Sequence, residues 1–353
     1  MNHVAIDLGG RESQICIRRS DGTIVAEERR PTRSLRKYLA GLEKSRVVVE
    51  TCAEAFGVAD AARETGHEAV VVPATLVRAL GVGARGLKND VRDSRNLSEA
   101  SCRMASLPSV HIPSQVSRDR KMSCGMREAL VASRTKLINT VRGWLRGQTL
   151  GILQKGSSVS FPSRVRKLLE AHGRPAPSCV ERQLVTIDHL NEQITAADTD
   201  LEALAKKDQT CQKLMTVPGV GPLTAVRFLA AIDEVKRFPN AHAVQSYIGL
   251  TPGESSSSDR KRNTSITKAG SRQLRWVLVQ AAWCAQRARP LDPMVLWARG
   301  IAERRGKGIA TVALARKIAG ILYALWQRGT TYEATRASTP SPSPLPSPSL
   351  PTE

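Results

Sequence analysis

The sequence predicts a mixed α/β domain over residues 1–110, a helical connector with a coiled coil over 111–210, and a mainly α-helical domain over 211–330. Three observations predict this order. Short apolar runs bounded by turn residues alternate with helical patterns in the first part, a seven-residue apolar repeat occupies the second, and apolar helices flank a Pro-Gly turn in the third. Residues 331–353 are Ser, Pro and Thr repeats, which predict a disordered tail.

The charge balance predicts a polyanionic partner. The 353 residues contain 53 Lys and Arg against 32 Asp and Glu, which gives a formal net charge of +21 and an isoelectric point near 10.3. Because basic residues recur along the whole chain, several surfaces could contact a phosphate backbone. We therefore expect nucleic acid as the partner, and no membrane.

Cysteine usage and apolar runs bear on the compartment. The seven cysteines are scattered without a CxxC pair, the six histidines are isolated, and the N-terminus lacks a signal-peptide pattern. No apolar run is long enough to span a bilayer. We expect a cytoplasmic protein with reduced thiols and no metal site built from cysteine or histidine.

The first domain is expected to follow the order βββαβαβ. An apolar run at residues 4–6 ends at Asp7, and a buried run at 47–49 ends at Glu50. A later helix, around residues 87–105, carries Asp90 and Asp93 at positions i and i+3. The remaining expected elements are strands at 15–17, 23–26 and 69–72 and helices at 34–42 and 53–64.

The four acids Asp7, Glu50, Asp90 and Asp93 form one candidate site. In sheets of this kind the carboxyl ends of neighbouring strands line a crevice, over which the later helix can close. Four clustered carboxylates repel one another unless a divalent cation lies among them, and hard oxygen ligands favour Mg²⁺ or Mn²⁺. Two such ions would support phosphoryl transfer. The alternative is that the helix acids only pair with adjacent Lys and Arg side chains, and that the strand acids are ordinary strand ends.

The connector is expected to be helical. Residues 118–146 interleave Arg and Lys with Leu, Ile and Val, which predicts one apolar and one cationic face. The pairs Ile187/Leu190, Ile194/Ala197 and Leu201/Leu204 follow each other in seven-residue steps, as in a coiled coil. Both a helical hairpin within one chain and a coiled coil between chains fit this repeat.

The third domain opens with residues 214–225, whose PGVG turn is typical of a helix-hairpin-helix motif. Such a turn exposes backbone N–H groups, so Gly219 and Gly221 are predicted to bind a nucleic-acid phosphate. A plain Gly-rich turn between helices is the alternative. Trp276, Trp283, Trp297 and Trp326 are predicted to lie in the core, and platforms for base stacking are the alternative.

The stretch from 249 to 275 carries the second candidate site. It contains four successive serines, Ser255 to Ser258, after a Pro-Gly pair, and its turn residues predict a loop. One interpretation is a serine nucleophile that attacks a phosphodiester; the other is a flexible linker beside a basic surface. The cations expected to hold nucleic acid are Arg260, Lys261, Arg262, Lys268, Arg272 and Arg275.

Over about residues 1–330 the chain resembles a known family. The resemblance rests on AIDLGG, VVVET, VVPATLVRALG, LKNDVRDS, LMTVPGVGPLTA, RFPNAHAVQSYIGLTPGESSSS and ITKAGSRQLR, in this order. These motifs are similar to those of insertion-sequence transposases that pair an N-terminal RNase H/RuvC-like DEDD domain with a C-terminal transposase domain bearing an essential serine. The pilin-gene invertase Piv belongs to the same group.

The resemblance implies roles for both candidate sites. Asp7, Glu50, Asp90 and Asp93 would be the metal-binding tetrad, and the catalytic serine would lie at Ser256–Ser257. Alignment of GLTP and ITKAG places Ser258 at the family's usual glycine, which makes Ser257 the first choice and Ser256 the second. The chain departs from the family pattern in that serine and in one extra residue in the loop.

The resemblance also implies partners and a mechanism. It implies a recombinase that cuts and rejoins double-stranded DNA at element ends through serine attack and a phosphoserine intermediate. A non-coding bridge RNA as guide and a homodimer or homotetramer are further implications. Two other interpretations of the residues stay open: a metal-dependent endonuclease of the Holliday-junction type that uses water, and a non-enzymatic nucleic-acid-binding scaffold.

Overall fold

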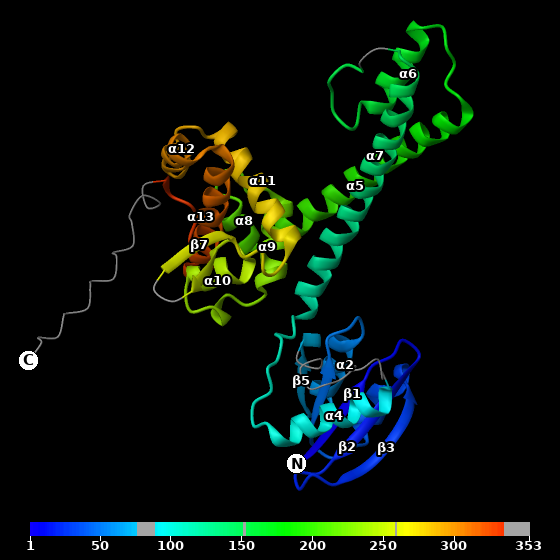
Figure 1. Cartoon of the computed structure of the whole chain (residues 1–353), viewed down its shortest axis with the longest axis vertical. Helices are drawn as coiled ribbons and strands as arrows, with labels where there is room; N and C mark the ends of the chain where they lie inside the picture. Colours follow the sequence, from blue (N-terminus) through cyan, green and yellow to red (C-terminus); the bar gives the residue numbers. More distant parts are fainter. Residues whose placement is uncertain (76–88, 151–152, 258–259, 335–353) are drawn as a thin grey trace, which may run out of the picture. The chain divides into compact units, whose positions relative to one another are not determined.

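The computed structural model describes residues 1–75, 89–150, 153–257 and 260–334, with the backbone alone at 254–263. The chain divides into two compact units, Met1–Ser114 and Gln115–Glu353 (Figure 1). The prediction of a disordered tail is wrong at residues 331–334, where Tyr332 N donates to Thr216 Oγ1 and its hydroxyl donates to Asp292 Oδ1, both at 2.8 Å. The rest of that tail, residues 335–353, and the Gly-rich passage at 81–86 lie outside the described residues.

A five-stranded sheet forms the middle of the first unit. Its strand order is β3-β2-β1-β4-β5; β1, β4 and β5 are parallel, whereas β2 is antiparallel to both β1 and β3. The order βββαβαβ is confirmed. The elements are β1 Asn2–Asp7, β2 Glu12–Arg18, β3 Ile24–Pro31, α1 Leu35–Ala40, β4 Ser45–Glu50, α2 Ala55–Glu64, β5 Glu68–Val72 and α4 Asp90–Arg103.

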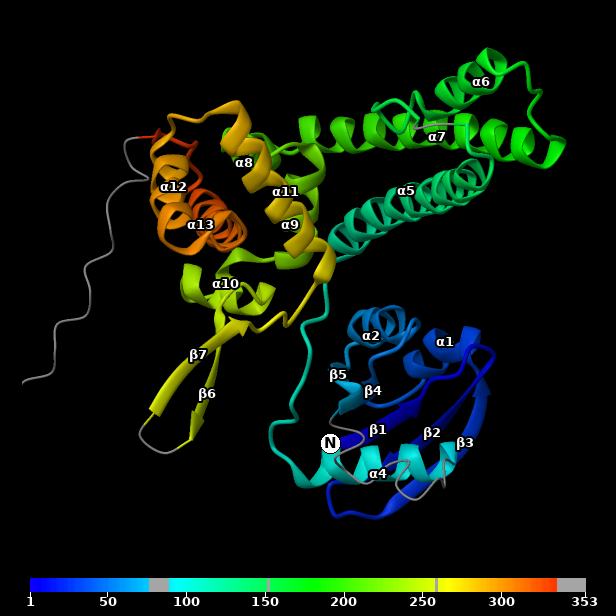
Figure 2. The same ribbon diagram turned by 45° about the horizontal axis from the view of Figure 1, so that its top comes forward.

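Both faces of this sheet are covered, because alternate residues of each strand point to opposite sides. Val4 and Ile6 of β1, with Val47 and Val49 of β4, pack in one core with residues of α1 and α2. On the other face, Ala5 and Val48 pack with Leu97 and Ala100 of α4. Figure 2 shows α4 lying across this face of the sheet. The apolar run of each central strand reflects this burial on two sides.

The connector is a helical hairpin within one chain. Helices α5 (Gln115–Gly147) and α7 (Ser178–Lys207) pack side by side in opposite directions, with α6 (Phe161–Ala171) beside them (Figure 1). The predicted heptad pairs are wrong in their second position. Leu204 is 40% exposed, whereas Asn191 and Ala205 are buried. The buried face of α7 therefore continues with the residue four positions after Ile187 and after Leu201, and not with the residue three positions after.

Three arginines of α5 lie on the side of the helix that faces α7. They recur every seven residues and pair with two polar residues of α7 and with Asp208, which directly follows that helix. Arg120 binds Asp208, Arg127 donates to Asp198 at 3.1 Å, and Arg134 donates to the Asn191 Oδ1 at 2.8 Å. Polar residues at core positions of a coiled coil fix its register, so this ladder sets how α5 and α7 align.

The rest of the second unit is a helical core. It contains α8 Gln209–Leu214, α9 Pro222–Ile232, α10 Ala241–Ile248, α11 Arg272–Ala288, α12 Pro293–Arg305 and α13 Lys307–Arg328. Helices α5 and α7 also pack against α9, so the connector belongs to this unit. Helix α13 has the length and apolar composition of a membrane span, contrary to the expected absence of such a run. Half of it is buried among the other helices, as in a core helix.

The prediction of an irregular loop at residues 249–275 is wrong. Strands β6 (Pro252–Ser257) and β7 (Arg260–Ile266) form an antiparallel hairpin (Figure 2). The two strands satisfy each other's backbone groups. Neither strand shows the apolar alternation by which sequence patterns reveal a strand, since β6 reads PGESSS and β7 reads RKRNTSI.

The predicted core position is also wrong for three tryptophans. Trp276, Trp283 and Trp297 are 56%, 38% and 44% exposed, and only Trp326 packs partly buried against the core. Helix α11 fills its inward face with other apolar side chains, among them Leu274 and Leu278, which leaves its tryptophans on the outward face.

Candidate functional site

Asp7 and Glu50 end two neighbouring parallel strands at the same edge of the sheet. The register of β1 and β4 pairs Ile6 with Val49, so the next residues of the two strands, Asp7 and Glu50, lie opposite each other. Neighbouring strands lie about 4.8 Å apart. Because Ala5 and Val48 face α4, alternation turns both acids to that same side. Both side chains are half-buried.

Helix α4 brings Asp93 to the same edge. His3 Nδ1 lies 2.8 Å from Ser101 Oγ, which places that end of β1 beside the C-terminal part of α4. From His3 to Asp7 the strand advances about 13 Å. From Ser101 back to Asp93 the helix covers about 12 Å. Asp93 is therefore level with Asp7, and it is 7% exposed.

Asp90 lies one turn further along α4, at its first residue, and is exposed. Asn89 caps the helix there: its side-chain oxygen accepts a hydrogen bond from Val91 N at 3.0 Å. An Asn in extended conformation directly before a helix is a strong N-cap signal. It makes α4 begin at Asp90, which places Asp90 in the first turn, one turn before Asp93.

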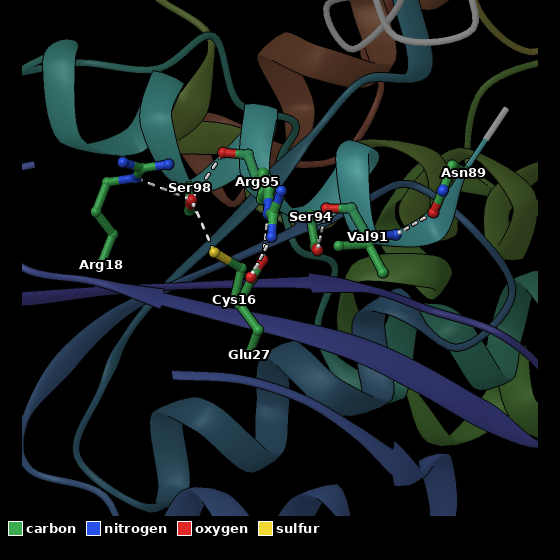
Figure 3. Close-up of polar contacts among 8 residues, drawn as sticks. All are labelled: Cys16, Arg18, Glu27, Asn89, Val91, Ser94, Arg95 and Ser98. Atoms are coloured by element: carbon green, nitrogen blue, oxygen red, sulfur yellow. Dashed lines mark hydrogen bonds and ion pairs between the residues drawn. The ribbon is translucent and has the colours of Figure 1, made fainter. Parts of the chain in front are cut away.

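Polar contacts hold α4 over β2 and β3 (Figure 3). Arg95 binds both carboxylate oxygens of Glu27 at 2.5 Å, and this guanidinium lowers the pKa of Glu27. Ser98 Oγ accepts from Arg18 Nε at 3.2 Å and lies 3.3 Å from Cys16 Sγ. Burial raises the pKa of the Cys16 thiol, so it stays protonated beside Ser98.

The four acids fit a divalent cation by the chemistry of their donor atoms. All four predicted ligands are carboxylates, the donors that Mg²⁺ and Mn²⁺ prefer. Within residues 1–75, 89–150, 153–257 and 260–334, no three His, Cys, Asp or Glu side chains are gathered closely enough to hold an ion. The backbone thus brings the acids to one edge, and a cation would have to draw their side chains together.

The predicted serine site lies on the hairpin of the second unit. Its backbone register pairs Ser256 with Lys261 and Ser257 with Arg260. All the predicted nucleic-acid-binding cations from 260 to 275 therefore lie on β7, on the turn after it, or on the first residues of α11. Lys268 and Arg272 are exposed, as nucleic-acid contacts require.

The base of the hairpin is tightly built. Gly249 has φ +79°, and a Cβ there would lie 2.2 Å from Ala269 O. Arg275 Nη1 donates to Ile248 O at 3.0 Å and to Gly270 O at 3.2 Å. Arg275, predicted to bind nucleic acid, thus has a structural role in joining α10 to the segment after β7.

The PGVG turn lies between α8 and α9, as expected. Gly219 has φ +83°, and a Cβ there would lie 2.1 Å from Ala281 O and 2.7 Å from Ala285 N, both in α11. A glycine is therefore required for helix packing at this position. Gly221 caps α9 in extended conformation, with no atom within 4 Å of an added Cβ. Phosphate binding by these two glycines stays a prediction.

Comparisons with known proteins match both units. A sequence model described as "Transposase IS116/IS110/IS902 family" matches residues 211–293, and one for the DEDD transposase domain of the IS110 group matches residues 4–149. The transposase for insertion sequence element IS1111A of Coxiella burnetii is 32% identical over 260 residues, which cover 69% of this chain and 68% of that protein. The chain belongs to the IS116/IS110/IS902 family of transposases.

Two further relatives extend the similarity over almost the whole transposase. A probable family 20 transposase of Pseudomonas aeruginosa is 26% identical over 341 residues, covering 94% of this chain and 98% of that protein. The transposase for insertion sequence element IS1328 of Yersinia enterocolitica is 27% identical over 340 residues, covering 93% and 98%. The two matched regions divide the candidate residues: the four acids lie in the first, and the turn and serine hairpin in the second.

Sequence reasoning missed three features of this transposase. The arginine ladder of α5 had a signal, because Arg120, Arg127 and Arg134 are spaced by seven residues like the apolar repeat of α7. The contacts of Ser98 with β2 gave no signal in the sequence, because the residues around Ser98 in α4 do not indicate which strand residues it contacts. The exposed tryptophans of α11 could have been found from their seven-residue spacing opposite the apolar stripe.

Proposed function

We propose that this transposase cuts and rejoins DNA at the ends of an insertion sequence, using the four acids with a divalent cation and a serine of the β6–β7 hairpin. The observation that carries the proposal is that the backbone places Asp7, Glu50 and Asp93 at one edge of the sheet, with Asp90 one helical turn away. We infer from this arrangement that the first unit is a RuvC-like domain of the DEDD type.

In the proposed reaction the Oγ of Ser257, or of Ser256 as second choice, attacks a DNA phosphorus atom. An O–P bond forms to serine, the P–O3′ bond breaks, the serine proton passes to solvent, and the leaving 3′ oxygen takes up a proton. Rejoining is the reverse attack by a different 3′-hydroxyl, so no external energy source is needed. A cation on the acids, Mg²⁺ or Mn²⁺, would supply charge that stabilises the transition state.

The acids and the serines belong to different units, so the reaction requires the two units to come together on one phosphodiester. The partner unit comes either from the same chain or from another copy in a dimer or tetramer. The net charge of +21 supports binding of both duplex DNA and a guiding bridge RNA. RNA co-purified with the transposase and matched to non-coding sequence beside its gene would test the guide.

The test of the cutting step uses end-labelled duplex DNA carrying an element end, incubated with the full chain and Mg²⁺ or Mn²⁺ and then run on a denaturing gel. We expect a covalent protein–DNA band that is lost in Ser257→Ala or Ser256→Ala and in Asp7→Asn. Ser255→Ala, in the same strand, is the matched control and should keep the band. If the Ser256→Ala/Ser257→Ala double variant still cleaves, the endonuclease interpretation is correct and the serine proposal is wrong.

A further inference from the structure

The outward face of α11 carries two exposed tryptophans between cations. The residues of this face recur at helical spacing, and all are exposed. They are Arg272, Trp276, Gln280, Trp283 and Arg287, which we call the α11 tryptophan face. Trp276 and Trp283 are seven residues apart, which places both indoles on one side of the helix, about 10.5 Å from each other along the axis.

Exposed indoles of this size need an explanation, because Trp is among the largest apolar side chains and burial of its ring is strongly favourable. Trp276 is 56% exposed although the opposite side of the same helix is fully buried at Leu274 and Leu278. Trp297 on α12 offers a comparison, since it is 44% exposed but carries the Lys317 ammonium 4.5 Å from its ring centre. That cation–π contact accounts for Trp297 within the chain.

Charge decides which partner suits this face. Helix α11 contains no Asp or Glu, and its outward side ends in Arg272 and Arg287. A second copy docked by two-fold symmetry would place Arg272 of one helix near Arg287 of the other, which like-charge repulsion disfavours. A polyanion with flat apolar groups satisfies both the cations and the rings.

We propose that the α11 tryptophan face binds unpaired nucleotides, whose bases stack on Trp276 and Trp283 while Arg272 and Arg287 contact the flanking phosphates. The spacing of about 10.5 Å corresponds to about three base steps of 3.4 Å. Stacking on aromatic side chains within a basic surface is the usual mode of single-strand binding. This surface goes beyond the proposed cutting step, because neither the four acids nor the β6–β7 hairpin contributes a residue to it.

The experiment measures binding of a fluorescently labelled 15-nucleotide oligothymidylate to the full chain in EDTA, so that cleavage plays no part. We expect Trp276→Ala/Trp283→Ala to weaken binding about tenfold or more, because each stacked base contributes substantially to affinity. Trp276→Phe/Trp283→Phe keeps an aromatic ring at each position and should stay within about threefold of the native protein. Trp297→Ala is the matched control and should change nothing.

Two further measurements test whether the bases, and not only the phosphates, contribute to binding. An abasic oligomer of the same length offers phosphates without bases, so the native chain should bind it about tenfold more weakly than oligothymidylate. Equal binding of the two would overturn the proposal without any variant. Unchanged oligothymidylate binding in the double alanine variant would also overturn it. So would a variant that binds oligothymidylate normally but no longer forms the protein dimers or tetramers of the native chain. Failure here leaves metal-dependent cleavage unaffected, so it is separable from failure of the proposed function.

Discussion

The acid edge of the first unit and the serine hairpin of the second are built in opposite ways. Asp7 and Glu50 end strands whose preceding residues are buried on both faces, and Asp93 is a buried residue of α4, the helix that covers one of these faces. The hairpin has two strands paired only with each other and is anchored at its base by Gly249, Gly270 and Arg275. An isolated two-stranded hairpin is marginally stable in water.

This contrast shows which contacts determine the position of each site. The position of the acids is fixed by the core of the sheet, so it survives changes elsewhere on the surface. The position of the serines depends on the few contacts at the hairpin base, and such a segment opens more readily than a central strand. We therefore interpret the acids as the fixed part of the reaction centre and the hairpin as the part that is brought to it.

The largest expected effect comes from the acid edge. Asp7→Asn removes one negative oxygen donor while keeping the shape of the side chain, and we expect strand cleavage to fall about a thousandfold. Folding should be unaffected, as measured by thermal unfolding. Asp21→Asn, in the turn between β2 and β3, is the control and should keep full activity. If Asp7→Asn cleaves like the native protein, the acid edge is not the reaction centre.

The second-largest effect is expected from a substitution at the base of the β6–β7 hairpin. In Gly249→Ala the new Cβ meets Ala269 O at 2.2 Å and the residue must keep φ +79°, so we expect a loss of about 3 kcal/mol of unfolding free energy. Hydrogen exchange should quicken in β6 and β7 and stay unchanged in β1 and β4. Gly300→Ala in α12 meets no atom within 4 Å and serves as control. A variant as stable as the native chain would mean that the base does not hold the hairpin.

A smaller effect is expected from the contacts that hold α4. Ser98→Ala removes the acceptor of Arg18 Nε, at a cost of about 1–2 kcal/mol. Because α4 carries Asp90 and Asp93, we expect Mn²⁺ affinity, measured by paramagnetic resonance, to fall about threefold to tenfold. Ser123→Ala removes a bond within α5 and is the control. Unchanged Mn²⁺ affinity with lowered stability would show that Ser98 supports the fold without positioning the acids.

The smallest effect is a pH dependence at His3. Burial is the main cause that lowers the pKa of His3 below its usual value near 6.5. The folded state therefore prefers neutral His3, so its contribution is complete above pH 6.5 and is lost as pH falls below that value. We expect the first unit to lose about 1 kcal/mol or less between pH 7.5 and 5.5 in urea unfolding. His3→Gln should remove this dependence; an unaltered dependence would assign it to other groups.

The sequence predicted the sheet well for a physical reason. Each central strand is buried on two faces, so its apolar run and the acid that ends it are visible without any partner. The hairpin escaped prediction because its strands lack the alternation of apolar and polar residues that marks a half-buried strand, and Ile266 of β7 packs against the helical core without such a pattern around it. Its order depends on the base contacts, which join residues far apart in sequence.

The connector and the tryptophans failed for a related reason. Asn191 and Asp198 occupy inward positions of α7 and are satisfied by arginines of α5, so the polar letters concealed the true heptad register. Trp276 and Trp283 were assigned to the core by residue type, although the apolar stripe of α11 was already complete without them. In α7 a tertiary partner overrode the local pattern, whereas in α11 the local pattern was correct and the residue type misled the prediction.

The most direct test of the central claim is to locate the covalent link itself. Protein–DNA adducts formed with Mg²⁺ on element-end DNA would be digested and the modified peptide sequenced by mass spectrometry. We expect a nucleotide on Ser257 or Ser256 in the native chain and no modified peptide from Asp7→Asn. Cleaved DNA without any serine-linked nucleotide, or a linkage on another residue, would contradict it.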